Sequence, residues 1–179
     1  MYTLHLKKNN WFALVLSLVF FVPSLVWALS EDVEQPVNIE ADSVTFDNSN
    51  GIADYEGNVI ITQGSLKILA SKVHIQAPEH EISTVTAFGS PLQLSQKMDD
   101  GQMIKGQGNK MTYDVKNKVM ILTGDAKLEQ GEDVISNNYI KYLPDTGKLH
   151  AGGKKNSGRV KAIFHPTNKA NKKQTKSGK

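Results

Sequence analysis

The sequence has no cysteine, and its histidines are few and scattered. Without cysteine the fold has to stand without disulfide bonds, so its core or its assembly must hold it together. The histidines do not cluster, so no metal site can be built from neighbours in sequence; they are His5, His74, His80, His150 and His165. We therefore expect neither a metal nor a cofactor.

The sequence also lacks the signatures of catalysis. His80 and Glu81 begin a zinc-protease motif, but Thr84 stands where the second histidine is required. Residues 101–106 have the spacing of a phosphate-binding loop, but Gln107 replaces its lysine, and there is no Gly-x-Ser-x-Gly elbow. Close carboxylate pairs fall in or beside turn signals, which indicates solvated side chains: Asp54/Glu56, Asp99/Asp100 and Glu132/Asp133. The chain is therefore not expected to be an enzyme.

Positive charge is scarce in the body of the chain and concentrated at its end. Residues 29–153 carry 10 Lys and Arg against 18 Asp and Glu, a net charge of −8, whereas residues 154–179 carry 9 basic residues and no acid. An acidic body whose lysines lack interleaved aromatic residues argues against nucleic-acid binding. Segment 166–179 has almost no apolar residues, so we expect a disordered, solvated basic tail.

A long hydrophobic run occurs at the N-terminus. Lys7 and Lys8 precede the apolar run 11–22, and Val26 and Ala28 offer small side chains at the positions that a signal peptidase reads. This pattern predicts a signal peptide over residues 1–28, cut after Ala28, and an exported body over residues 29–165 followed by the tail. An uncleaved membrane anchor is the alternative, although the segment is short for a span of about 20 residues.

Between residues 35 and 164 a helical period is absent and every second residue is apolar. Such alternation gives a strand one inward and one outward face. Turn signals interrupt it every eight to twelve residues, at Asn50-Gly51, Glu56-Gly57-Asn58, Gln63-Gly64, Asp100-Gly101, Thr123-Gly124-Asp125, Gln130-Gly131 and Asp145-Thr146-Gly147. We predict an all-β fold, an antiparallel meander of short strands.

The body is an internal repeat. Residues 41–75 fall without a gap on residues 108–142 when shifted by 67 positions. Seven positions are identical: Thr45/Thr112, Asp47/Asp114, Asn50/Asn117, Gly57/Gly124, Gln63/Gln130, Gly64/Gly131 and Ile68/Ile135. A repeat of alternating apolar residues and turn glycines describes stacked strands in two related halves.

A sheet stack that does not close into a barrel has two exposed edges. Their free N–H and C=O groups can pair with another chain, and prolines or charges are the usual protection. Pro36 and the lysine-rich segment after Gly153 supply such protection in part. Edges left open would join copies head to tail through a heterologous contact.

Several segments in fixed order carry a family resemblance: residues 35–42, 55–64, 88–91, 111–113 and 122–126. They resemble the LptA family, the OstA-like periplasmic lipopolysaccharide-transport proteins of Gram-negative bacteria, as does the basic C-terminus. The resemblance implies an open antiparallel β-jellyroll, twisted and V-shaped. It also implies a periplasmic bridge protein that carries lipopolysaccharide from the inner to the outer membrane, with the lipid A acyl chains in an apolar trough. Implied partners are an LptC-like inner-membrane protein, an LptD-like outer-membrane protein and further copies of the chain, joined head to tail.

An inward row of apolar side chains could shelter acyl chains at about 0.8 kcal/mol per buried methylene. The candidate lipid-binding residues are Val37, Ile39, Phe46, Ile61, Ile68, Ile75, Leu92, Leu94, Tyr113, Val115, Ile121 and Leu128. Each of them taken singly is equally explained by core packing, and only the row as a set indicates lipid binding.

Two other functions stay open at this point. A membrane-tethered LptC-like protein would have the same fold and keep its N-terminal helix. A purely structural repeat protein would polymerise and bind no lipid.

Overall fold

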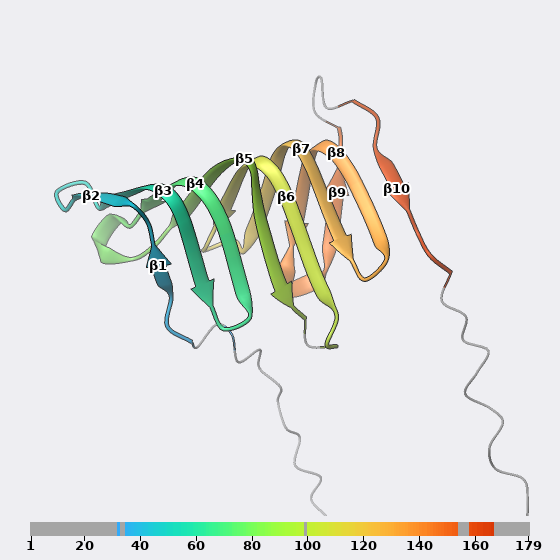
Figure 1. Cartoon of the computed structure of the whole chain (residues 1–179), viewed down its shortest axis with the longest axis horizontal. Coiled ribbons are helices and arrows are strands. Elements are labelled where there is room, and N and C mark those ends of the chain that lie inside the picture. The colour runs from blue at the N-terminus through green and yellow to red at the C-terminus, as the bar shows by residue number, and fades with distance from the viewer. Residues whose placement is uncertain (1–31, 33–34, 99, 154–157, 167–179) are drawn as a thin grey trace, which may run out of the picture.

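The computed structural model describes residues 32, 35–98, 100–153 and 158–166, and these form a single ten-stranded sheet (Figure 1). The predicted signal peptide and nearly all of the predicted tail lie outside the described residues. The strands are β1 (Asn38–Glu40), β2 (Ser43–Asp47), β3 (Ile52–Gln63), β4 (Leu66–Gln76), β5 (Thr84–Lys97), β6 (Met103–Asp114), β7 (Val119–Gln130), β8 (Asp133–Leu143), β9 (Lys148–Ala151) and β10 (Lys161–Ile163). Two 3-10 turns, Pro78–His80 and Pro144–Thr146, lie between strands. The all-β prediction is confirmed.

The six long strands β3 to β8 form an antiparallel meander in which each strand pairs with the next. Two short strands, β1 and β2, lie one after the other along β3. At the opposite end of the sheet, β9 and β10 lie in the same way along β8. Both edges of the sheet therefore consist of two short strands instead of one long strand.

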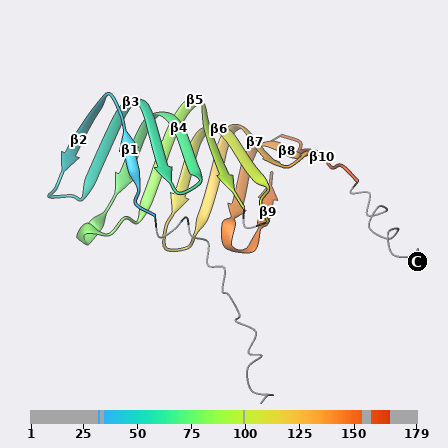
Figure 2. The same cartoon turned by 60° about the horizontal axis from the view of Figure 1, so that its bottom comes forward.

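Each long strand bends near its middle, so the sheet folds over into two leaves that are joined at the bend and separate on the opposite side (Figures 1 and 2). The pairing register shifts at every bend, for example between Glu56 and Val59 in β3 and between Phe88 and Leu92 in β5. Leaf A comprises β1, 59–63, 66–69, 92–97, 103–107, 126–130, 133–137 and β10. Leaf B comprises β2, 52–56, 72–76, 84–88, 110–114, 119–123, 139–143 and β9.

The prediction of short strands is wrong, because two of the seven turn signals lie inside strands. Gly57 and Gly124 have φ angles of 79° and 75°, and the residues that follow, Asn58 and Asp125, are also left-handed, at 46° and 48°. A glycine followed by Asn or Asp suits a β-bulge as well as a hairpin turn. Here these pairs bend β3 and β7, whereas the other five signals connect consecutive strands.

The structure reproduces the repeat. The bounds of β3 and β4, shifted by 67 residues, coincide with those of β7 and β8. The preceding turns match as well: Asp47 accepts hydrogen bonds from the backbone and side-chain nitrogens of Asn50, at 3.2 and 2.7 Å, and Asp114 does so from Asn117, at 2.9 and 2.8 Å. Hydrogen bonds within these turns lower the pKa of both carboxyls, with the Ser49 side chain as the largest cause at Asp47 and the Asn117 backbone at Asp114. The repeated Asp and Asn residues therefore stabilise equivalent turns.

One hydrophobic core lies between the two leaves and draws side chains from both. Its largest fully buried side chains lie next to the bend, and they are Val59, Val73, Leu92, Leu122 and Ile140. The leaves thus pack on each other along the bend, and their separated margins form the mouth of the fold.

Candidate functional site

The inner faces of the two leaves form an apolar trough along the whole sheet. In leaf A a continuous row crosses the strands from β1 to β8, because cross-strand partners share a face. It consists of Ile39, Ile61, Ile68, Leu94, Gly106, Leu128 and Ile135. Glycine in this row leaves room for its neighbours, since a Cβ at Gly106 would lie 2.9 Å from Leu94 Cγ.

Leaf B presents two parallel rows to the trough. The row near the bend is Val44, Tyr55, Val73, Ala87, Met111, Leu122, Ile140 and Ala151. The row near the mouth is Phe46, Ala53, Ile75, Val85, Tyr113, Met120, Tyr142 and Leu149. Each row is apolar from one end of the sheet to the other.

Exposure increases from the bend towards the mouth. Leu92 and Leu122 at the bend are 0% exposed, whereas Val85 and Tyr113 near the mouth are only partly buried. Both phenols are uncharged at neutral pH, as tyrosine ordinarily is, and burial raises the pKa of Tyr113 and of Tyr142 further. The leaf B side of the mouth therefore offers apolar surface with hydroxyl groups, whereas the leaf A side ends in a mixed row that contains Gln96, Ile104, Gln130 and Asp133.

Nine of the twelve predicted lipid-binding residues lie on the inner face. They are Ile39, Phe46, Ile61, Ile68, Ile75, Leu92, Leu94, Tyr113 and Leu128. Val37 lies just before β1 and is half exposed, and Val115 lies just after β6 and is partly buried. The structure thus brings most of the set together on one surface, and their contact with lipid stays a prediction.

The inward position predicted for Ile121 is wrong. Ile121 pairs with Thr112 and Lys141, whereas its neighbours Met120 and Leu122 are buried. Residues 119–122 are all apolar, so alternation alone could not tell which pair faces inward. The repeat does contain the missing signal, because the residue 67 positions before Ile121 is the charged Asp54.

The list of candidate lipid-binding residues leaves out a second set of inward residues, most of them in leaf B, although the alternating pattern itself places several of them on the inward face. These are Val59, Val73, Ala87, Ile104, Met111, Met120, Leu122, Ala126, Ile140 and Tyr142. Several lie in runs of consecutive apolar residues, such as 119–122. In such runs alternation cannot show which residues face inward.

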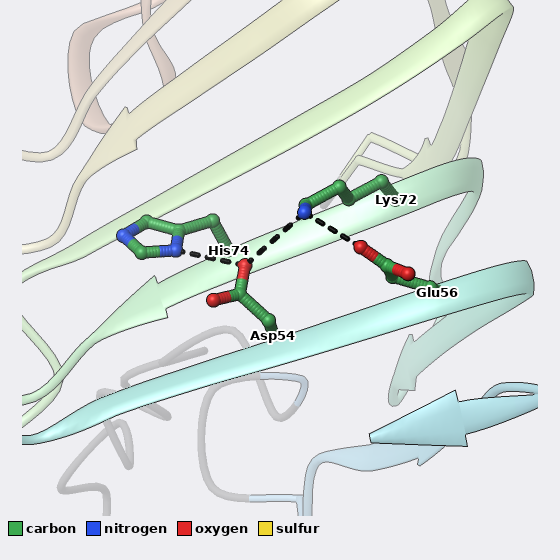
Figure 3. A network of polar contacts seen from close by, with 4 residues as sticks. All are labelled: Asp54, Glu56, Lys72 and His74. Atoms are coloured by element: carbon green, nitrogen blue, oxygen red, sulfur yellow. Dashed lines mark hydrogen bonds and ion pairs between the residues drawn. The ribbon is translucent and has the colours of Figure 1, made fainter. Parts of the chain in front are cut away.

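The outer face of the sheet is polar. On β3 and β4, Asp54 lies 3.0 Å from Nδ1 of His74 and 3.7 Å from Nζ of Lys72, which also contacts Glu56 at 2.7 Å (Figure 3). The Glu56 side chain, by hydrogen bond and charge, raises the pKa of Lys72. Asp54 and Glu56 lie on a strand and not in a turn as predicted. Because these side chains are well solvated, the network contributes little to stability.

Two pockets of about 340 and 510 Å³ also lie on the outside of the leaves. The first, on leaf A, is lined mostly by lysine, glutamine and serine side chains that include Lys67, Lys105 and Lys127. The second, on leaf B, contains Ile121 beside Thr112 and Lys141. Neither offers the continuous apolar surface of the trough.

Apolar side chains are also exposed at the two ends of the sheet. At the N-terminal edge Val37, Val44 and Phe46 are 50%, 44% and 60% exposed. At the C-terminal edge Val160, Ile163 and Phe164 are 46%, 57% and 65% exposed. Exposed apolar groups gathered at the edge strands of a sheet are typical of surfaces that bind another chain.

Within the described residues, no three His, Asp or Glu side chains are grouped so as to hold a metal ion. The same part of the chain contains no helix that is long and apolar enough to cross a membrane.

Comparisons with known sequences agree with these features. A family model described as "LptA/(LptD N-terminal domain) LPS transport protein" matches residues 38–148. The lipopolysaccharide export system protein LptA of Haemophilus influenzae is 36% identical over 157 residues, which cover 86% of this chain and 91% of that protein. LptA of Escherichia coli K12 is 33% identical over 158 residues, which cover 86% of this chain and 85% of that protein.

A solved structure shows the same fold. LptH, described as the LptA-homologous periplasmic component of the lipopolysaccharide transport device of Pseudomonas aeruginosa, matches with a TM-score of 0.68 at 27% identity. The match covers 75% of this chain and 99% of that chain. Together with the open, bent sheet, this likeness confirms the predicted open antiparallel β-jellyroll.

Proposed function

The chain belongs to the family of LptA and LptD N-terminal-domain lipopolysaccharide transport proteins, and from this we propose that it is a periplasmic bridge protein that carries lipopolysaccharide from the inner to the outer membrane. The relatives named above are transport proteins, LptA and LptH, which favours this function over an LptC-like tether and over an enzyme. The observation that carries the proposal is the apolar trough between the leaves.

We place the lipid A acyl chains between the two leaves, entering from the mouth. The long strands run from one leaf into the other at the bend, and the leaves otherwise meet through apolar side chains, which an acyl chain can displace near the mouth. Each methylene transferred from water to this surface contributes about 0.8 kcal/mol. The sugars and phosphates stay in solvent outside the mouth, because burying unpaired charges there would cost more than the chains contribute.

The test of lipid binding uses two neighbouring positions on β6. Tyr113 faces the mouth of the trough and Thr112 faces outward, so Tyr113→Asp puts a charge in the proposed lipid path and Thr112→Asp does not. We expect the exported Tyr113→Asp protein to retain much less lipopolysaccharide on purification than the wild type, and Thr112→Asp to retain the wild-type amount. Both variants should show wild-type far-ultraviolet circular dichroism.

Equal lipopolysaccharide retention by the two variants would contradict lipid binding in the trough. Purified wild-type protein that assembles but contains no lipid would instead support the purely structural repeat protein. Tyr113 is preferred to Leu94 for this test, because Leu94 is buried and an aspartate there would also disturb the core.

We further propose that residues 1–28 are removed on export. The support is the basic N-terminal pair, the apolar run and the small side chains before residue 29. Mass spectrometry of the periplasmic protein should give a mass that begins at Leu29. A full-length chain in the membrane fraction would contradict cleavage and support the tethered alternative.

The proposed partners are domains of the same fold, joined edge to edge. Support comes from the two unpaired edges with their exposed apolar side chains, and from a family model that covers both LptA and the N-terminal domain of LptD. Copies of the chain would join head to tail, with an LptC-like protein and an LptD-like protein at the two ends of the row. Strand addition suits such edges, because backbone hydrogen bonds provide affinity and side chains provide register.

A further inference from the structure

The repeat places equivalent strands in the middle of the molecule and at its two edges. When their residue numbers are increased by 67, β1 and β2 fall within β6. They also pair with β3 in the way that β6 pairs with β7: Ile39 lies opposite Ile61, and the equivalent Gly106 lies opposite Leu128. The N-terminal edge is therefore a copy of β6, interrupted at residues 41–42.

The C-terminal edge is likewise a copy of β5. Leu149 of β9 pairs with Tyr142, as Val85 of β5 pairs with Ile75, the residue 67 positions before Tyr142. Ala162 of β10 pairs with Ile135, as Leu94 pairs with the equivalent Ile68. Here the copy is interrupted by the segment between β9 and β10.

In the intact sheet β5 and β6 pair with each other along their length and join the two halves of the molecule. Among the described strands, the edge equivalent to β5 and the edge equivalent to β6 both have one side without a partner strand. We propose that the C-terminal edge of one copy pairs with the N-terminal edge of the next in the register of β5 on β6, a deduction that rests on the head-to-tail assembly proposed above.

This register fixes which residues lie opposite each other. The pairs Thr84–Asp114 and Gln93–Gln107 of the central seam become Lys148–Asp47 and Lys161–Glu40 between copies. The pairs Val85–Tyr113 and Leu94–Gly106 become Leu149–Phe46 and Ala162–Ile39. Two of the four outward pairs thus join a lysine to a carboxylate, and the other two are His150–Thr45 and Ile163–Asn38, whereas the inward pairs join apolar side chains.

The match in chemistry is an independent support for the register. A shift by one residue would turn the inner face of one copy towards the outer face of the next. A shift by two that places Lys161 opposite Asn38 would put Arg159 opposite Glu40 but would move Lys148 from Asp47 to Thr45, so that Asp47 would lose its lysine. Phe46 is 60% exposed in the single copy, whereas its equivalent in β6, Tyr113, is partly buried beside β5. In the proposed register Leu149 lies opposite Phe46, as Val85 of β5 lies opposite Tyr113.

The inner rows of the trough then continue from copy to copy without a break. Ala162 and Ile39 extend the leaf A row, and Leu149 and Phe46 extend the mouth row of leaf B. A lipid moving along the trough would therefore meet the same surface at the junction between copies as at the seam inside one copy.

Disulfide cross-linking can test the register directly, since the chain has no cysteine of its own. One preparation carries Lys161→Cys and a second, distinguishable in mass, carries Glu40→Cys. Directly opposed residues have Cβ atoms about 4.5–5.5 Å apart, close to what a disulfide needs, whereas diagonal neighbours are about 7–8 Å apart. We expect a disulfide-linked heterodimer from this mixture and much less from Lys161→Cys mixed with Asn38→Cys, which also faces outward but lies two residues away.

Charge reversal gives a second readout without cysteine. Glu40→Lys alone and Lys161→Glu alone should each weaken assembly about fivefold in light scattering or sedimentation. The double variant Glu40→Lys, Lys161→Glu should restore it, and the control Lys110→Glu on the central strand β6 should leave it unchanged.

The outcomes separate the two proposals. Preferential linking through Asn38, or no rescue by the double variant, would overturn this register and leave head-to-tail assembly standing. Monomers at all concentrations would overturn both, whereas lipid binding is judged separately by the Tyr113→Asp experiment.

Discussion

Replacement of Leu92 by alanine is expected to lower the free energy of unfolding by about 2–5 kcal/mol. Leu92 is fully buried at the bend, where the two leaves are in contact, and truncation there would leave a cavity that the two leaves cannot close. For a domain whose total stability is about 5–15 kcal/mol, this is a large fraction. Urea denaturation of both proteins measures the difference.

Leu69→Ala is the matched control for this experiment. Leu69 is the same residue type in leaf A but points outward from β4 and is 37% exposed, so its loss should cost about 1 kcal/mol or less. Equal losses at the two positions would mean that the interior at the bend is not close-packed. Lipopolysaccharide binding by Leu92→Ala also separates core packing from lipid contact. If Leu92 only packs the core, each folded molecule of the variant should bind the same amount of lipopolysaccharide as the wild type.

The second large loss of stability is expected from Gly51→Ala, in the turn between β2 and β3. Its φ is +63°, and a Cβ there would lie 2.3 Å from the backbone oxygen of Ala77. Left-handed backbone costs an ordinary residue about 1–2 kcal/mol, and the overlap adds about 1–3 kcal/mol because backbone has to move. The backbone nitrogen of Ala77 donates a 2.7 Å hydrogen bond to the Gly51 oxygen, so the turn cannot shift without losing that bond.

Gly101→Ala isolates the steric part of this effect. Gly101 has a similar φ of +83°, but among the described residues other than its two chain neighbours no atom lies within 4 Å of its hypothetical Cβ. We therefore expect a loss of only about 1–2 kcal/mol at Gly101, from backbone strain alone. Thermal or urea unfolding of the two alanine variants compares them, and a Gly51→Ala protein no less stable than Gly101→Ala would contradict the close approach to Ala77.

The repeat was the part of the sequence that predicted the fold best. It depends on residues whose roles are local, such as Asp47 with Asn50 and Asp114 with Asn117, which form the same turn twice. Period-two alternation then identified the strands, because the trough is apolar and the outer face polar over most of their length.

Two features could not be predicted from local pattern. Gly57 and Gly124 bend strands that continue beyond them, and only pairing with neighbouring strands distinguishes such a bend from a hairpin turn. Residues 119–122 are apolar on both faces, so only the register of β7 with β6 and β8 determines which of its residues face inward. The depth of each side chain within the trough likewise depends on the distance from the bend, which no spacing in the sequence encodes.

The interrupted edge strands have a mechanical consequence. Inside one copy β5 and β6 are joined over 11 register pairs, whereas the edges offer a neighbour only short strands, β1 and β2 with 3 and 5 residues and β9 and β10 with 4 and 3. A row of copies under tension or dilution would therefore part at its junctions while every unit stayed folded. Such a row could lengthen, shorten or exchange members one unit at a time, and so adjust itself to the width of the gap it spans.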